Sequence, residues 1–145
     1  MEEIRIRVAV LIIEEGKILL VQHHKDGRKY WLLPGGGVDY GETLVECAKR
    51  EIREEANLEV EIEDLLFINE SIPPDRHRHV LNLYFRGKIT GGNLQIGQEP
   101  ILDAIEFVDL SRLDSLTLYP NVKQEIKDLA AGIKPEVISL GNRWA

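Results

Sequence analysis

Apolar and polar residues alternate at the start of the chain. Every second position from Ile4 to Ile12 is apolar, and the residues between them become apolar too, which predicts a strand buried on both faces toward its end. Residues 14–17 form a predicted turn and 18–22 a second strand, so a hairpin is expected. A polar loop at 25–29 and a short extended stretch at 30–33 follow. The glycines after Pro34 predict a structured loop without regular secondary structure.

A helix is predicted to begin after Thr43. Thr43 and Glu46 have the spacing of a capping box, in which each side chain bonds the other residue's backbone N–H. Asn57 is expected to end the helix, because asparagine tolerates the left-handed backbone of a helix C-terminus. The stripe expected to be buried consists of Leu44, Val45, Ala48, Ile52 and Ala56.

The second half of the chain reads as strands with one more helix. Strands are predicted at 60–71, 79–89 and 101–108, with a turn at 90–93 and a short helical turn at 111–113. An amphipathic helix is expected over 121–131, with Val122, Ile126 and Leu129 facing inward. Strands interleaved with two helices predict an α/β sandwich with a mixed sheet.

Composition limits the possible functions. The 145 residues fit one domain, and 43% hydrophobic with 30% charged residues is typical of a globular protein. The net charge of −7 argues against a nucleic-acid-binding protein. Cys47 is the one cysteine, so no disulfide can form within the chain. The sequence contains neither a signal-peptide pattern nor a membrane-span length of apolar residues, and a cytoplasmic location is expected.

The most informative cluster is acidic. Glu51, Glu54 and Glu55 lie at i, i+3 and i+4 of the predicted helix and therefore share one face. An acidic helix face alone is usually just solvated. Three carboxylates held this close favour a cation between them, and hard oxygen ligands suit Mg²⁺ or Mn²⁺ better than zinc. Such a site is suited to a phosphate-bearing substrate.

The acidic helix and the glycines before it form a longer pattern. It consists of Gly36, Glu42, Arg50-Glu51-Ile52, Glu54-Glu55 and Leu58, with the lead-in at 31–38. This pattern resembles the signature of the Nudix hydrolases, apart from Asn57, where that family usually has glycine. The resemblance implies a Nudix-type α/β/α sandwich with a mixed β-sheet, a loop–helix–loop catalytic motif and a Mg²⁺ cofactor that Mn²⁺ can replace.

The resemblance also implies roles for individual residues. Glu51, Glu54, Glu55 and Gly36 would hold the metal, and Arg50 would orient one of the glutamates. The backbone of Gly35, Gly36 and Gly37 would approach the substrate. Glu42 would brace the loop or join the metal site through water. A carboxylate must accept a proton from the attacking water, and the candidates are Glu54, Glu55 and Glu99, which precedes the strand expected at 101–108.

The implied substrate is a nucleoside diphosphate linked to another group. In the Nudix hydrolases a proline about sixteen residues past the motif is associated with ADP-ribose pyrophosphatases, and Pro73 matches that position. ADP-ribose or a nucleotide sugar is therefore the favoured substrate, and nucleoside triphosphates or dinucleoside polyphosphates are alternatives. A catalytically silent nucleotide-sensing module is a further alternative, although the acidic residues are all present.

Other residues are candidates for substrate contact. Arg76 and Arg78 lie in a basic loop that would either meet phosphate or simply be solvated. Tyr84 is a candidate for stacking on a base, as are Tyr30, Trp31 and Phe85, although strand aromatics are more often core residues. Arg5, Arg7 and Arg86 add positive charge to the site if their strands are adjacent. The apolar tail at 137–140 with Trp144 either supports a homodimer or packs on its own domain.

Overall fold

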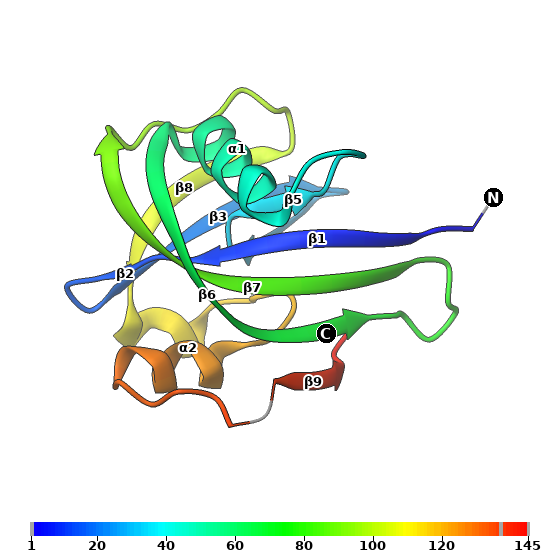
Figure 1. The fold of residues 1–145 in the computed structure, drawn as a ribbon. Coiled ribbons are helices and arrows are strands. Elements are labelled where there is room, and N and C mark those ends of the chain that lie inside the picture. Colours follow the sequence, from blue (N-terminus) through cyan, green and yellow to red (C-terminus); the bar gives the residue numbers. More distant parts are fainter. Residues whose placement is uncertain (1, 137, 145) are drawn as a thin grey trace.

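The computed structural model describes residues 2–136 and 138–144, and in these residues two sheets lie between two helices (Figure 1). The elements in chain order are β1 Ile4–Leu11, β2 Ile13–Glu14, β3 Lys17–Lys25, β4 Arg28–Leu32, β5 Gly35–Gly37, α1 Leu44–Ala56, β6 Leu58–Ser71, β7 His79–Gly92, β8 Leu102–Asp109, the 3₁₀ helix η1 Leu110–Ser115, α2 Lys123–Ala130 and β9 Ser139–Asn142.

The larger sheet is mixed, as predicted. Its strand order is β5-β1-β7-β6-β9, with β1 parallel to β7 and β6 parallel to β9. The second sheet contains β2, β3, β4 and β8. The predicted hairpin is correct only in its last residues, because β1 lies between β5 and β7 and only the short β2 pairs with β3.

The alternating residues of β1 supply two hydrophobic cores, which explains why this strand is apolar on both faces. Val8 and Val10 pack with Ile52 of α1. Ala9 and Leu11 pack with a second cluster that includes Ile126 of α2. Helices therefore cover the strands from two sides, and the expected α/β/α sandwich is confirmed.

The glycine segment is not an irregular loop, and that prediction is wrong. Residues Gly35 to Gly37 form β5, antiparallel to β1. A Cβ at Gly35 would lie 1.9 Å from the carbonyl oxygen of Val8, so only glycine can lie this close to the neighbouring strand. The glycines therefore allow tight strand pairing here. The turn predicted at 90–93 is wrong for a similar reason, since β7 continues to Gly92.

Helix α1 begins and ends as predicted. The Thr43 hydroxyl accepts a hydrogen bond from the Glu46 N–H, and the Glu46 carboxylate accepts one from the Thr43 N–H. Asn57 has φ 58° and ψ 36°, the left-handed conformation expected of it. Val45 is 41% exposed, so the predicted stripe is wrong at this first-turn position. The helix buries Cys47 and Glu55 on its inner face instead.

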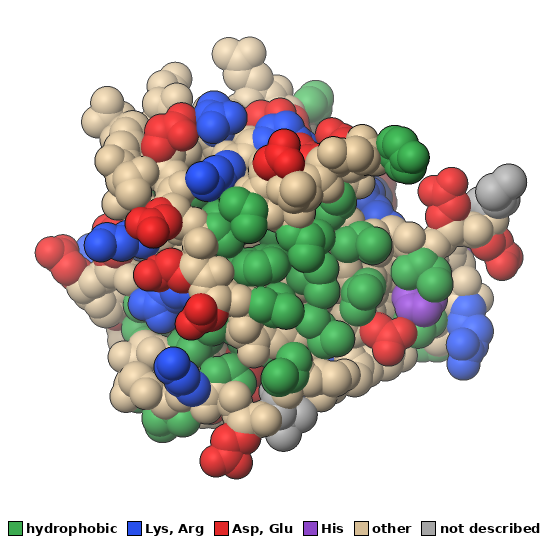
Figure 2. Space-filling view, viewed as in Figure 1, with side chains coloured by type: hydrophobic (Ala, Val, Ile, Leu, Met, Phe, Trp, Pro, Cys, Tyr) green, Lys and Arg blue, Asp and Glu red, His purple; other side chains and the backbone are tan. Residues whose placement is uncertain are grey.

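The outer face of the mixed sheet is only partly covered by α1. Figure 2 shows hydrophobic side chains gathered on this face, over β1, β7 and β6. Ile4 and Ile6 of β1 are 63% and 42% exposed, and in the parallel register Ile6 lies beside Leu81 of β7.

The C-terminal tail packs on its own domain. Strand β9 pairs with β6, and the Asn142 side chain bonds both the N–H and the carbonyl of Ile72. Trp144 lies under the guanidinium of Arg78, 5.4 Å from its Cζ. Val137, which belongs to the predicted apolar tail, lies outside the described residues. Across residues 2–136 and 138–144, no helix combines the length and apolar character needed to cross a membrane.

Asn57 offers a test of the helix end. Asn57→Gly keeps the left-handed conformation but loses the hydrogen bond from the Asn57 amide to the Asn93 carbonyl, so the free energy of unfolding should change by less than about 1 kcal/mol. Asn57→Ala loses that bond and must also adopt a strained φ, and we expect a loss of roughly 2 kcal/mol. Urea unfolding of the two variants measures both values. Equal losses would show that backbone conformation does not set the stability here.

Candidate active site

The guanidinium of Arg50 joins the elements of the site. Its Nε and Nη2 donate to the two carboxylate oxygens of Glu42 at 2.6 and 2.9 Å, a bidentate pair. Its Nη1 donates to Glu51 at 2.8 Å and to Glu54 at 3.3 Å, and its Nη2 also donates to the Gly37 carbonyl at 3.2 Å. The hydrogen bonds from Arg50 hold the pKa of Glu42 at about 2. Arg50 thus links β5, the loop before α1 and the acidic face of α1.

Three carboxylates meet beside Arg50. One oxygen each from Glu51, Glu54 and Glu99 lies within 4.8 Å of the others. Burial raises the pKa of Glu51, with the nearby charges of Glu54 and Glu99 adding to the effect, while Arg50 opposes it. A cation among these oxygens would relieve the repulsion, and three converging hard oxygen donors fit Mg²⁺ or Mn²⁺. The residues present therefore fit the metal that the sequence predicts.

Glu55 lies behind this group. It is 4% exposed, and its Oε1 accepts a hydrogen bond from the Gly35 N–H at 2.8 Å. Burial raises its pKa to about 8, and the charges of Glu51 and Glu99 contribute to this shift. Glu55 therefore braces β5 from beneath the acidic group, a role that the sequence did not predict.

The glycines of β5 lie directly against charged side chains. A Cβ at Gly36 would lie 2.4 Å from the carboxylate carbon of Glu51, and one at Gly37 would lie 2.9 Å from the Arg5 guanidinium. The missing Cβ atoms therefore let these two charged groups lie against the backbone of β5. Cys47, under this strand, is buried, and burial raises the pKa of its thiol to about 12, which makes it a poor nucleophile.

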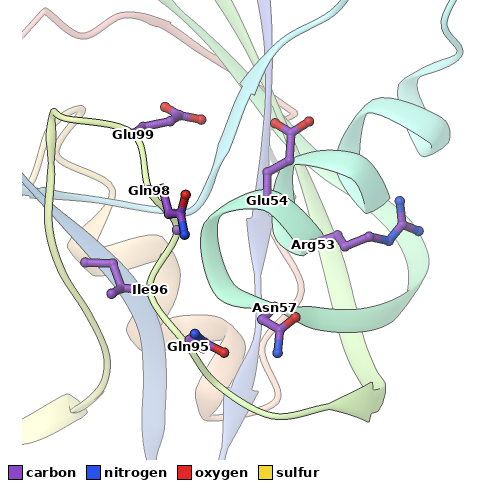
Figure 3. Close-up of a pocket in the computed structure, with 8 residues that line it drawn as sticks. Arg53, Glu54, Asn57, Gln95, Ile96, Gln98 and Glu99 are labelled. Atoms are coloured by element: carbon purple, nitrogen blue, oxygen red, sulfur yellow. The ribbon is translucent and has the colours of Figure 1, made fainter.

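The residues between β7 and β8, which we call the 93–101 loop, bring Glu99 to the helix. This loop and the end of α1 line a surface pocket of about 550 Å³, formed by Arg53, Glu54, Asn57 and residues 95–99. Figure 3 shows the carboxylates of Glu54 and Glu99 side by side at one end of this pocket, while Arg53 points away from it. Residues that are distant in the sequence thus form one acidic site.

The arginines of the β6–β7 loop lie elsewhere. Arg76 and Arg78 are exposed at the end of β6 opposite to its junction with α1 (Figure 1). In the described part of the chain neither arginine is hydrogen-bonded or ion-paired to α1 or β5. The structure therefore does not bring them together with the acidic group.

Tyr84 is a core residue. It is 0% exposed, its ring packs on Phe67, and its hydroxyl donates to Asn69 at 2.7 Å. Trp31 and Phe85 are buried as well. The prediction that Tyr84 stacks on a base is incompatible with this burial. Among the predicted aromatics only Tyr30 is partly exposed, and it packs against Tyr119.

Two arginines of β1 lie closer to the site. The Arg5 guanidinium lies against Gly37. Arg7 donates to the Leu33 carbonyl at 2.8 Å, and its charge opposes the rise that burial causes in the pKa of Glu55. Strands β1 and β7 are adjacent, as the prediction required, but Arg86 lies beside Leu11 at the other end of β1 and lines a different pocket with Leu129, so it adds no charge to this site. Sequence alternation placed both arginines on one face of β1, but only the pairing of β1 with β5 shows that this face meets the glycines.

The family follows from comparison with known proteins. The model of the NUDIX domain matches residues 3–129, which include the whole site described above. The chain belongs to the NUDIX domain family. The sequence resemblance is thereby confirmed, and Asn57 at the usual glycine position leaves the membership intact.

Relatives in the Nudix family carry several activities in their names. The chain is 36% identical over 107 residues to an ADP-ribose pyrophosphatase of Methanocaldococcus jannaschii, a match covering 73% of this chain and 62% of that protein. It is 35% identical over 100 residues to the human 8-oxo-dGDP phosphatase NUDT18, covering 68% of this chain and 29% of that protein. Both matches thus span less than two thirds of the relative.

A solved structure matches over nearly the whole chain. The crystal structure of an ADP-ribose pyrophosphatase from Streptococcus suis has a TM-score of 0.69 and 27% identity, and the match covers 97% of this chain and 99% of the other. The mixed sheet and the helix arrangement are therefore those of a Nudix protein.

Arg50 can be tested with a matched pair of variants. Arg50→Lys cannot keep the bidentate contact with Glu42 while also donating to Glu51, so we expect the affinity for Mn²⁺ to fall by roughly 10- to 100-fold. Arg53→Lys is the control, because Arg53 lies on the same helix as Arg50 but points away from the pocket and pairs with exposed Glu59 of β6. Isothermal titration with Mn²⁺ measures both affinities. Equal affinities in the two variants would show that Arg50 does not orient the glutamates for metal binding.

Proposed function

We propose that this Nudix protein is a Mg²⁺-dependent hydrolase that cleaves the diphosphate bond of a nucleoside diphosphate linked to another group, with ADP-ribose or a nucleotide sugar as the favoured substrate. The observation that carries this proposal is the convergence of Glu51, Glu54 and Glu99 beside a glycine strand. A diphosphate has the negative charge that such a metal site is suited to receive.

Each residue of the site then has a task. Glu51, Glu54 and Glu99 would hold the ion, with Glu55 and the backbone of Gly36 adjoining it. Arg50 orients Glu51 and Glu54 and ties them to Glu42. The backbone of Gly35, Gly36 and Gly37 would lie along the substrate, and the Arg5 guanidinium beside Gly37 would donate to a phosphate oxygen.

In the proposed reaction, water attacks one phosphorus of the diphosphate, the bond from that phosphorus to the bridging oxygen breaks, and the other phosphate leaves. When bound, the metal would lower the pKa of a coordinated water and neutralise phosphate oxygens. A carboxylate of the site accepts the proton from the water, and the candidates are Glu54, Glu55 and Glu99. Glu54 and Glu99 are exposed at the pocket, whereas Glu55 is buried and hydrogen-bonded to β5, which favours the first two as the base.

The preference for ADP-ribose rests on two similar proteins and on Pro73. The archaeal and the streptococcal relatives are both named ADP-ribose pyrophosphatases. The name of the human relative favours an oxidised deoxynucleotide as the alternative. A silent nucleotide-sensing module is disfavoured, because every acidic residue of the motif is present and Arg50 orders the group.

Arg76 and Arg78 enter this proposal only if a substrate reaches the β6–β7 loop. Homodimerisation and the cytoplasmic location stay predictions. The tail contacts its own sheet, and we expect any second copy to cover the apolar face seen in Figure 2. Light scattering of the purified protein would decide the oligomeric state.

The central carboxylate can be tested directly. Glu54→Gln removes one charge from the site without changing the side-chain volume, and we expect turnover at saturating substrate to fall by about 10²-fold or more. Glu61→Gln, an exposed change on β6, should leave turnover unchanged. Near-normal turnover of Glu54→Gln at saturating Mg²⁺ would contradict the assignment.

The substrate needs a panel with product identification. ADP-ribose, a nucleotide sugar, a nucleoside triphosphate, a dinucleoside polyphosphate and 8-oxo-dGDP are each incubated with Mg²⁺ or with chelator, in water enriched in ¹⁸O. We expect the highest kcat/KM for ADP-ribose, no turnover in chelator, and ¹⁸O in one of the two phosphate products, which identifies the phosphorus attacked. Tight binding without turnover of any of these nucleotides would favour the sensing module.

A further inference from the structure

The 93–101 loop is seated on the C-terminal turn of α1. Gln95 N–H donates to the Ala56 carbonyl at 2.9 Å, and Gly97 N–H donates to the Glu55 carbonyl at 3.0 Å. The Asn57 amide donates in turn to the Asn93 carbonyl at 2.9 Å. The last carbonyls of a helix have no partner within it, so these bonds satisfy groups that would otherwise need water. The loop is therefore fixed to the helix by backbone contacts.

Gly97 lies at the closest approach of this loop to the helix. A Cβ on Gly97 would lie 2.2 Å from the Glu54 carbonyl oxygen and 3.3 Å from the Glu55 Cα. Both are helix backbone atoms, which cannot rotate aside. Since non-bonded carbon and oxygen atoms stay about 3.3 Å apart, any side chain here would push the loop away by roughly 1 Å.

Glu99 is only two residues beyond Gly97, and its position matters. One oxygen of its carboxylate lies within 4.8 Å of a carboxylate oxygen of Glu51 and of Glu54. Their negative charges repel Glu99, and its side chain is exposed. Without a fixed loop the like charges would drive Glu99 into solvent. Metal ligands tolerate displacements of only about 0.2 Å, so a 1 Å shift of the loop is large for this site.

We propose that Gly97 is a positioning residue: its lack of a side chain lets the 93–101 loop rest on the backbone of α1, and this contact holds Glu99 among the carboxylates that bind the metal. The inference rests on the proposed metal site. The end of α1 then has two roles. Its acidic side chains supply metal ligands, and its backbone carbonyls hold the loop that carries the third carboxylate (Figure 3).

The test measures Mn²⁺ affinity of the substrate-free protein by isothermal titration. Gly97→Ala and Glu99→Gln should each weaken binding by roughly 10- to 100-fold. The control is Gly91→Ala, because a Cβ at Gly91 meets only the Glu59 Cβ at an ordinary 3.8 Å, and binding should stay within about twofold of wild type. If Gly97 acts through Glu99, the double variant Gly97→Ala/Glu99→Gln should bind no more weakly than Glu99→Gln alone.

The possible results distinguish a failure of the positioning role of Gly97 from a failure of the proposed metal site. Wild-type affinity in Gly97→Ala, or additive losses in the double variant, would overturn the role of Gly97 while leaving the metal site in place. No Mn²⁺ binding by the wild type, or no effect of Glu99→Gln, would overturn the metal site and this inference with it.

A second variant covers the case in which Gly97→Ala does not fold, as judged by urea unfolding of the metal-free protein. Asn57→Gly keeps the helix end but removes the bond to Asn93. It should weaken Mn²⁺ binding several-fold in the wild-type background and not at all in the Glu99→Gln background. Unchanged affinity in Asn57→Gly would then overturn the inference.

Discussion

Repulsion among carboxylates confined near α1 is the constraint on which the site depends. Glu42, Glu51 and Glu54 all accept hydrogen bonds from Arg50, and Glu99 meets Glu51 and Glu54 from the 93–101 loop. One guanidinium cannot neutralise four carboxylates, and Glu51 is half-buried, where like charges repel more strongly than in water. A cation among these oxygens would relieve the repulsion, and the proposed phosphate chemistry depends on that cation.

The scaffold holds these charges by backbone contacts that tolerate no side chain. Gly35 lies against the Val8 carbonyl, and its N–H anchors the buried Glu55. Gly97 lies against the Glu54 carbonyl in the same manner. Helix α1 is therefore held between β5 at one side and the 93–101 loop at its end. Both contacts fix the helix backbone or side chains at Glu54 and Glu55. Rigid support of this kind is what a metal site requires to keep its ligands in place.

Much of this arrangement could be predicted from local sequence. The capping box at Thr43, the left-handed Asn57 and the inward residues of α2 follow from rules that act within a few residues, and the structure contains all of them. The predictions for the β5 glycines and for Tyr84 are wrong because these positions depend on tertiary contacts. The glycines pair as a strand because β1 lies beside them, and Tyr84 is buried because both sheets enclose it. The position of Arg5 beside Gly37 likewise needs the register of β1 with β5.

The central claim is that Glu51, Glu54 and Glu99 bind one divalent cation over the diphosphate of a nucleotide. Crystals grown with Mn²⁺ and a non-hydrolysable ADP-ribose analogue would test it by anomalous diffraction. The account predicts a manganese peak about 2.1 Å from oxygens of these glutamates and bridged to phosphate oxygens beside β5. Ordered nucleotide with no metal peak between the carboxylates, or with Glu99 turned away from α1, would contradict it.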